Sequence, residues 1–151
     1  MFSTVRYFIK TAIIFLIVGL IAGLFMITSK YLFEFYYPFG LISAHTHIIL
    51  IGFVMMMIMG VAIWFFPRAE KEDKKYKPTL ILLIYGLITI STAIRFISEV
   101  VFAYLNDPYS KILIFISSTG QVFSFILFFY SIWGRIRSAG SHLREAKGEK
   151  F

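Results

Sequence analysis

The segment TAIIFLIVGLIAGLFMITS, residues 11–29, decides the class of this protein, because it lies between Lys10 and Lys30 and contains no charged side chain. An α-helix needs about 20 mostly apolar residues to cross the roughly 30 Å hydrocarbon core of a bilayer. Three further stretches of the chain are long and apolar enough to do the same. We therefore predict an all-α integral membrane protein, a four-helix bundle formed by residues 1–137. The predicted spans are about 8–30, 41–66, 78–105 and 111–135.

The composition of the whole chain supports a membrane protein. Of its 151 residues, 59% are hydrophobic and only 15% are charged, whereas soluble domains are about half apolar. Because there is no cysteine, disulfides and thiolate metal sites are excluded. The net charge of +7 predicts no nucleic-acid partner, since Lys and Arg beside membrane spans report topology instead.

Lysines and arginines are distributed unequally between the two sides of the predicted bundle. Arg6 and Lys10 precede the charge-free run of the first span, whereas the two short loops at the opposite side, with the span ends beside them, hold only Lys30 and Lys111. By the positive-inside rule, both termini and the loop between the second and third spans face the cytoplasm. Residues 138–151 form a predicted basic cytoplasmic tail. The remaining flanking cations are Arg68, Lys71, Lys74, Lys75, Lys77, Arg135, Arg137, Arg144, Lys147 and Lys150.

Polar side chains inside the predicted spans gather at one depth. His45 and His47 begin the second span, Arg95 and Glu99 lie in the outer half of the third, and Gln121 lies in the outer half of the fourth. Polar groups are costly in hydrocarbon and are functional candidates by default. We expect these side chains to converge in the outer half of the bundle. Smaller polar residues accompany Gln121 on the fourth span: Ser117, Ser118 and Thr119.

Arg95 and Glu99 are four residues apart, so they share one helix face and are expected to pair. Arg95 could instead neutralise an anionic group such as a heme propionate. Gln121 could hydrogen-bond either partner. A purely structural ion pair explains the same spacing equally well.

The two histidines of the second span differ in their surroundings. They are two residues apart, or about 200° around a helix, so both face one pocket only if the helix start is unwound. Gly52 lies about 20° from the face of His45, which leaves room for a flat macrocycle beside that ring. The spacing therefore favours His45 as an iron ligand. An interfacial residue or an interhelical hydrogen bond is the alternative for either histidine. On the helix face of His47, by contrast, the side chains are bulky: Ile51, Val54 and Ile58.

Two further patterns favour packing over ligand binding. Gly19 and Gly23 form a GxxxG motif, which permits close approach of another helix, either within this chain or in a second copy. Methionine is flexible and fills irregular gaps in cores. We interpret the methionines of the second span as packing residues: Met55, Met56, Met57 and Met59.

The segment AHTHIILIGF, residues 44–53, continues to Gly60 and to WFFPR at 64–68. It resembles the second helix of heme–copper oxidase subunit I, the family of cytochrome c oxidases and nitric oxide reductases. It also resembles the short, four-helix, subunit I-like homologues of that family. The resemblance implies a b-type heme with His45 as axial ligand, His47 being the alternative alignment. It also implies electron transfer or diatomic gas binding in a bacterial or archaeal cytoplasmic membrane.

The chain departs from that family in its histidine content. It has three histidines, and His142 lies in the tail, whereas a heme–copper centre needs more ligands on further helices. We therefore do not expect it to reduce oxygen, or to act as an enzyme on its own. The second axial ligand could come from a second copy, from the partner's His47 or from another subunit. Its absence would leave five-coordinate iron open to a gas.

Two other interpretations use the same residues. The first is a copper or other transition-metal site formed by His45 and His47, with Glu99 as a third ligand, because imidazole and carboxylate suit such ions. The second is a non-catalytic accessory subunit of a respiratory complex. In each case the lipid bilayer is a partner, and we expect a homodimer or a larger respiratory complex.

Overall fold

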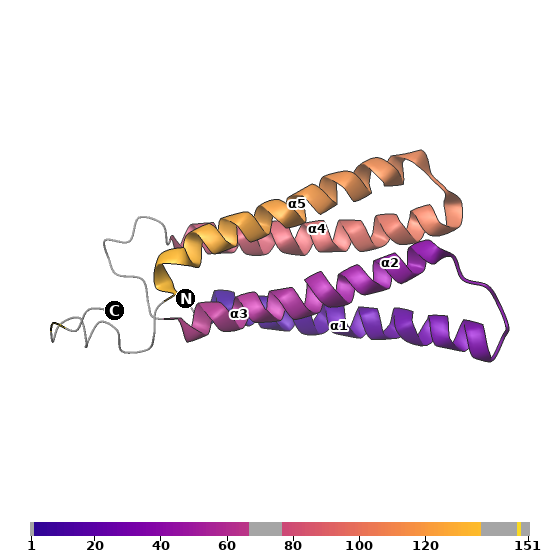
Figure 1. Ribbon diagram of the computed structural model, residues 1–151, viewed down its shortest axis with the longest axis horizontal. Helices are drawn as coiled ribbons and strands as arrows, with labels where there is room; N and C mark the ends of the chain where they lie inside the picture. The colour runs from indigo at the N-terminus through magenta and orange to yellow at the C-terminus, as the bar shows by residue number, and fades with distance from the viewer. Residues whose placement is uncertain (1, 67–76, 137–147, 149–151) are drawn as a thin grey trace.

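The computed structural model describes residues 2–66, 77–136 and 148, and its regular structure within these residues is helical. Four helices are long and apolar enough to cross a membrane, which confirms the predicted all-α, four-helix architecture (Figure 1). The predicted tail 138–151 and most of the basic loop lie outside the described residues, apart from Gly148. The orientation across the membrane stays a prediction. The helices in question are Thr4–Tyr31, Phe39–Phe65, Pro78–Leu105 and Pro108–Arg135.

The helices form two antiparallel pairs. Helix α1 (Phe2–Tyr31) packs against a second span built from α2 (Phe39–His47), η1 (Ile48–Met55) and α3 (Met56–Phe65). Figure 1 shows α4 (Pro78–Leu105) beside α5 (Pro108–Ile132), with the connections 32–38 and 106–107 together at one end of the bundle, here called the loop end. The opposite end, where the chain begins, is called the terminal end. The second pair comprises α4 (Pro78–Leu105), α5 (Pro108–Ile132) and the short η2 (Trp133–Arg135).

Local sequence accounts for the sharp turn between α4 and α5. Asn106 ends α4 with a φ of 49°, a left-handed conformation that asparagine tolerates at helix ends. Asp107 then caps α5, because its carboxylate accepts the backbone N–H of Ser110 at 2.9 Å. Pro108 occupies the first turn of α5, where a missing N–H costs nothing. The two helices are thereby joined at the loop end by a connection of two residues, Asn106 and Asp107.

The middle of the second span is a π-helix, η1. Its i→i+5 hydrogen bonds turn the chain less per residue than an α-helix, and such segments are frequent at functional sites. His45 and Gly52 nevertheless both face α1, as the predicted common face requires. Gly60 faces α1 as well, because a Cβ added there would lie 3.0 Å from Cβ of Phe8.

The prediction of open space beside Gly52 is wrong. A Cβ added at Gly52 would lie 2.9 Å from the ring of Phe15 on α1. The small residues of this face admit α1 side chains at van der Waals distance, and the predicted room for a macrocycle is filled by protein. Gly52 is therefore a packing residue.

The GxxxG motif of α1 packs against the second span of the chain. Gly19 contacts the side chain of Ile49, and a Cβ added at Gly23 would lie 3.0 Å from Cε1 of His45. Internal packing is thus the use of this motif that the structure shows.

The apolar core lies toward the terminal end. Phe8, Met56, Met59 and Ile84 are fully or almost fully buried there, so the packing role predicted for the methionines is confirmed for these two. Arg135 is also buried, and it donates to the carbonyl oxygens of Ile63 and Phe66 at the end of α3. A cation at a helix C-terminus stabilises its unpaired carbonyls.

The contact between Gly52 and Phe15 predicts the effect of one methyl group. We expect Gly52→Ala to destabilise the protein by about 1–3 kcal/mol, the usual cost of overpacking. Gly86→Ala on α4 is the matched control, because nothing lies within 4 Å of its added Cβ. Thermal unfolding in detergent, followed by circular dichroism, measures both. Equal stability of the two variants would contradict the tight contact.

Candidate functional site

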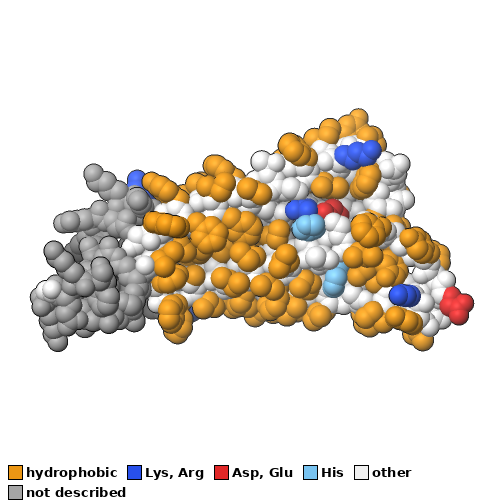
Figure 2. Space-filling model, in the orientation of Figure 1, with side chains coloured by type: hydrophobic (Ala, Val, Ile, Leu, Met, Phe, Trp, Pro, Cys, Tyr) orange, Lys and Arg blue, Asp and Glu red, His pale blue; other side chains and the backbone are white. Residues whose placement is uncertain are grey.

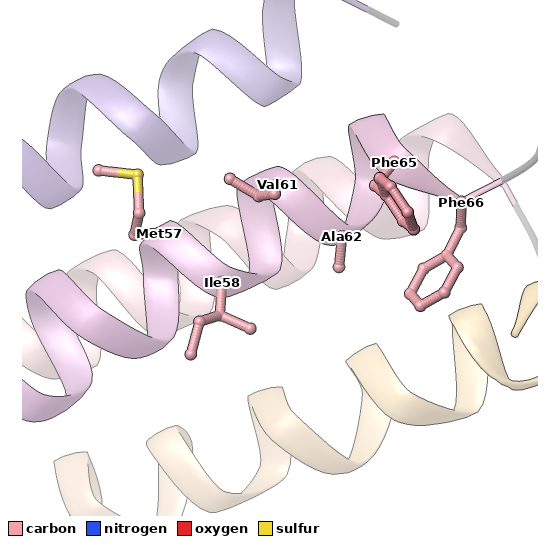
Figure 3. Close-up of a pocket in the computed structure, with 6 residues that line it drawn as sticks. All are labelled: Met57, Ile58, Val61, Ala62, Phe65 and Phe66. Carbon is pink, nitrogen blue, oxygen red and sulfur yellow. The ribbon is translucent and has the colours of Figure 1, made fainter.

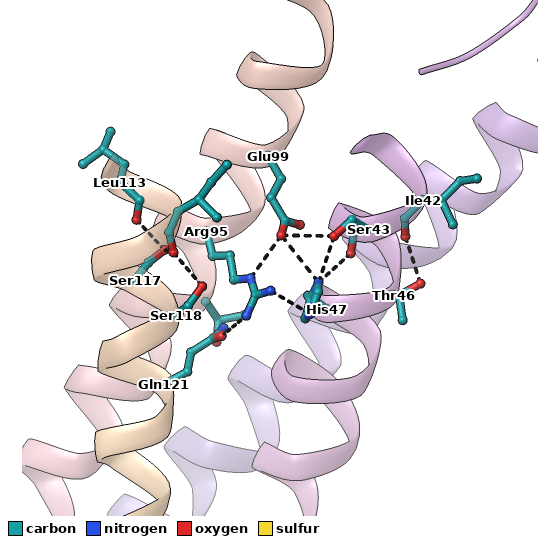
Figure 4. Close-up of polar contacts among 12 residues, drawn as sticks. Ile42, Ser43, Thr46, His47, Arg95, Glu99, Leu113, Ser117, Ser118 and Gln121 are labelled. Atoms are coloured by element: carbon teal, nitrogen blue, oxygen red, sulfur yellow. Dashed lines mark hydrogen bonds and ion pairs between the residues drawn. The ribbon is translucent and has the colours of Figure 1, made fainter. Parts of the chain in front are cut away.

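Arg95 is the centre of a polar cluster that joins three helices in the loop-end half of the bundle (Figure 4). Its Nε donates to Oε1 of Glu99 at 3.1 Å, and its Nη1 donates to Oε1 of Gln121 at 2.8 Å. Its Nη2 donates to Nε2 of His47 at 2.7 Å. The predicted convergence of these side chains and the predicted pairing of Arg95 with Glu99 are confirmed.

Two residues of the cluster were not predicted from the sequence. Ser43 donates its hydroxyl to Oε1 of Glu99 at 3.2 Å, and Thr92 accepts Nε2–H of Gln121 at 3.2 Å. Their spacing carries a signal, because Ser43 is four residues before His47 and Thr92 is three before Arg95. Residues at these spacings share a helix face.

The cluster is largely shielded from its surroundings. The side chains of Arg95 and Glu99 are 16% and 7% exposed, and Gln121 is buried. The guanidinium and carboxylate compensate each other's charge, as charges inside a bilayer must. Among the described residues, nothing hydrogen-bonds Oε2 of Glu99.

His47 uses both of its ring nitrogens within the cluster. A guanidinium can only donate, so Nε2 of His47 accepts from Arg95 and its Nδ1 carries the proton. That proton is donated to the backbone oxygen of Ser43 at 2.9 Å, with Oε1 of Glu99 3.5 Å from Nδ1. The ring of His47 is thereby held as a neutral tautomer between α2 and α4.

His45 faces the other way, toward α1. Its Nδ1 donates to the backbone oxygen of Gly19 at 2.9 Å, since a carbonyl oxygen can only accept. The neutral ring therefore has its lone pair on Nε2, and no described residue hydrogen-bonds that atom. The residue is half-buried. Histidine side chains reach the molecular surface beside apolar ones in Figure 2.

The two histidines thus contact different helices, as their spacing predicts for a regular helix start. A metal-ligating histidine usually donates its other N–H to a carbonyl or carboxylate, which fixes the tautomer. His45 has this arrangement, whereas both nitrogens of His47 are taken. Within residues 2–66 and 77–136, no group of three or more His, Cys, Asp or Glu side chains is placed to hold a metal ion.

The small polar residues of α5 do not join the cluster. The hydroxyls of Ser117, Ser118 and Thr119 donate to backbone oxygens of their own helix, one turn earlier. Of the polar residues predicted on this span, Gln121 alone reaches Arg95. The difference has a physical reason, because a short hydroxyl side chain reaches its own carbonyl ladder more easily than a neighbouring helix.

A separate apolar groove follows α3 in the terminal-end half (Figure 3). Its cavity volume is about 350 Å³, and every lining side chain is apolar. It therefore offers no polar or ionisable group for chemistry. The lining residues are Met57, Ile58, Val61, Ala62, Phe65 and Phe66.

Comparisons of this chain with protein-family models, with curated proteins and with solved structures find no match. The geometry around Arg95 and His45 is therefore the basis on which a function is assigned.

The closed cluster predicts strong coupling between Arg95 and Glu99. We expect Arg95→Leu to destabilise the bundle by about 3–5 kcal/mol, because it leaves a buried carboxylate without its counter-charge. The double variant Arg95→Leu/Glu99→Leu should lose less than this single variant. Reversible unfolding in mixed detergent micelles measures the free energies of the wild type, the two single variants and the double variant, which form a double-mutant cycle.

Thr119→Ala is the control on α5, because Thr119 is exposed and bonds only its own helix. Its free energy of unfolding should stay close to that of the wild type. Additive losses in the Arg95 and Glu99 double variant would contradict the coupling.

Proposed function

We propose that this chain is a b-type heme-binding membrane protein with His45 as an axial ligand, acting in electron transfer or diatomic gas binding. The observation that carries the proposal is the His45 ring. Its Nδ1–H is bonded to Gly19, and its Nε2 lone pair has no partner among the described residues. The resemblance of residues 44–53 to the heme-bearing helix of heme–copper oxidases supports the same assignment.

The chain's own groups fit this role in three respects. The bond from Nδ1 to a carbonyl selects the tautomer that ligates through Nε2 and increases the basicity of the ring. The packing of the ring against Gly23 fixes its orientation. Apolar surroundings suit the faces of a porphyrin, which supplies the redox-active iron when bound.

Arg95 fits a supporting role near the acidic substituents of such a group. It donates to Glu99, Gln121 and His47 through three nitrogens, and an arginine has five N–H donors in all. Donors therefore remain for an anionic substituent such as a propionate. Glu99 and Gln121 hold the guanidinium in place.

The filled space beside Gly52 limits where a heme would lie. Phe15 occupies the face between α1 and the second span, so a macrocycle on His45 would lie at the outer surface of the bundle. A surface position needs a cover, which favours a homodimer or a larger respiratory complex. The chain alone lacks the histidines of a heme–copper centre, and we do not propose oxygen reduction.

The copper alternative requires more rearrangement. His45 and His47 contact different helices, and recruiting His47 would break its bonds to Arg95 and Ser43. The accessory-subunit alternative has a specific observation in its favour. The cluster around Arg95 joins α2, α4 and α5 as a structural element would, with or without a cofactor.

Absorption spectra of detergent-purified protein from heme-sufficient cells test the proposal. We expect a Soret band in the wild type that is lost in His45→Ala, because the axial ligand is removed. The band should persist in His47→Ala, since both nitrogens of that ring are already engaged. A wild type without a Soret band would exclude heme and leave the copper and accessory-subunit alternatives.

The close contact between Gly23 and the ring of His45 predicts a second, smaller effect, on heme affinity. A Cβ at Gly23 would press on Cε1 of His45 at 3.0 Å, so we expect Gly23→Ala to weaken heme affinity by about 10–100-fold, as changes to a ligand's supporting partners do. Gly86→Ala is again the control. Heme titration of the apoprotein gives the affinities, and equal values for the two variants would mean that α1 does not orient the ring.

A further inference from the structure

The connection between α1 and α2, with the residue that flanks it on each side, is rich in aromatic residues and mostly exposed. Residues 31–39, YLFEFYYPF, are called the aromatic loop here. It lies at the loop end of the bundle (Figure 1), where Tyr36 is 86% exposed. Such a surface in contact with water would be unfavourable. The other large side chains exposed in it are Tyr31, Leu32, Phe33, Phe35 and Phe39.

The length of α1 indicates what surrounds this loop. Its candidate membrane span, Thr4–Tyr31, has 28 residues, and at 1.5 Å per residue it is about 42 Å long. A bilayer with its headgroup layers is about 40–45 Å thick. A helix of this length that crosses the bilayer ends among the headgroups, and the aromatic loop begins where α1 ends.

Two lysines at the same end match this environment. Nζ of Lys30 lies 5.2 Å from the ring centre of Tyr31, and Nζ of Lys111 lies 5.3 Å from that of Phe102. Lysine stems lie along apolar surface while their ammonium groups reach polar surroundings. Phosphate groups of lipids are the complementary anions at this level. Glu34 is nearby in sequence and, with Asp107, balances the two cations.

We propose that the aromatic loop binds the headgroup–acyl boundary of the leaflet at the loop end, with phospholipid as its partner. Tyrosines are enriched at this level because their rings have an apolar body and a polar tip. The exposed apolar face of α1, including Leu24 and Ile27, leads directly into the loop. Lipid contact therefore continues along one surface. The proposal does not depend on heme binding.

The loop also sets the depth of the candidate site. α2 begins at Phe39, and His45 follows six residues later, or about 9 Å along the helix. An anchored loop therefore holds His45 just inside the hydrocarbon, below the boundary. Without the anchor, spans of 27 or 28 residues could slide or tilt in the bilayer.

Tryptophan fluorescence tests the proposal on the full chain in phosphatidylcholine vesicles. The two native tryptophans, Trp64 and Trp133, are both at the terminal end and are replaced by phenylalanine. Tyr36→Trp then provides the reporter, and Leu50→Trp, in the middle of the second span, provides the matched deep control. Lipids brominated near the headgroup or near the chain end, together with aqueous iodide, report depth.

We expect the Tyr36→Trp reporter to be quenched more by shallow than by deep bromines, and the Leu50→Trp control to show the reverse. Iodide should quench the reporter severalfold less than it quenches N-acetyltryptophanamide. Adding anionic lipid should change neither value, because the local charges balance. Phe33→Ser with Phe35→Ser should raise iodide quenching of the reporter.

Iodide quenching equal to that of N-acetyltryptophanamide would overturn the proposal and indicate a surface presented to a soluble protein. Stronger quenching by deep than by shallow bromines would also overturn it. Quenching left unchanged by the two serine substitutions would exclude an anchoring role for those rings.

Discussion

The ion pair between Arg95 and Glu99 constrains the loop-end half of this bundle. Two charges on one helix inside a bilayer must be compensated, or the helix could not remain there. The pair alone leaves donors on the guanidinium, and Gln121 and His47 accept them from two other helices. The requirement to satisfy one arginine therefore sets the relative positions of α2, α4 and α5.

The position of α1 has a different origin, since it contributes nothing to that cluster. It is held by close packing, in which Gly52 and Gly60 admit Phe15 and Phe8 while Gly19 and Gly23 admit side chains of the second span. In lipid, where no hydrophobic force draws helices together, such close approach supplies the attraction. His45 lies in this packed seam and is oriented by the backbone of α1.

Much of this arrangement follows from the sequence, and the remainder has identifiable reasons. Charge-free runs locate the spans, and the spacing of Arg95 and Glu99 predicts their contact. The angle between His45 and Gly52 predicts a shared face correctly, but an angle does not reveal what fills the space beside a glycine. Phe15 comes from a distant segment, and nothing in its own surroundings marks it as the occupant. The π-helical turn from Ile48 onward likewise has no residue pattern that distinguishes it from an α-helix.

The two histidines differ in which ring nitrogen is left for a ligand, because their hydrogen-bond partners differ. Both ring nitrogens of His47 are hydrogen-bonded, and a guanidinium contacts the nitrogen that would otherwise ligate. His45 has one nitrogen bonded and the other without a partner among the described residues. Since α1 fills the interior space beside it, any group that it binds must be reached from outside the bundle. Under the proposed function, such a site would be completed by something beyond the chain, so the surface around His45 would take part in both ligand binding and assembly.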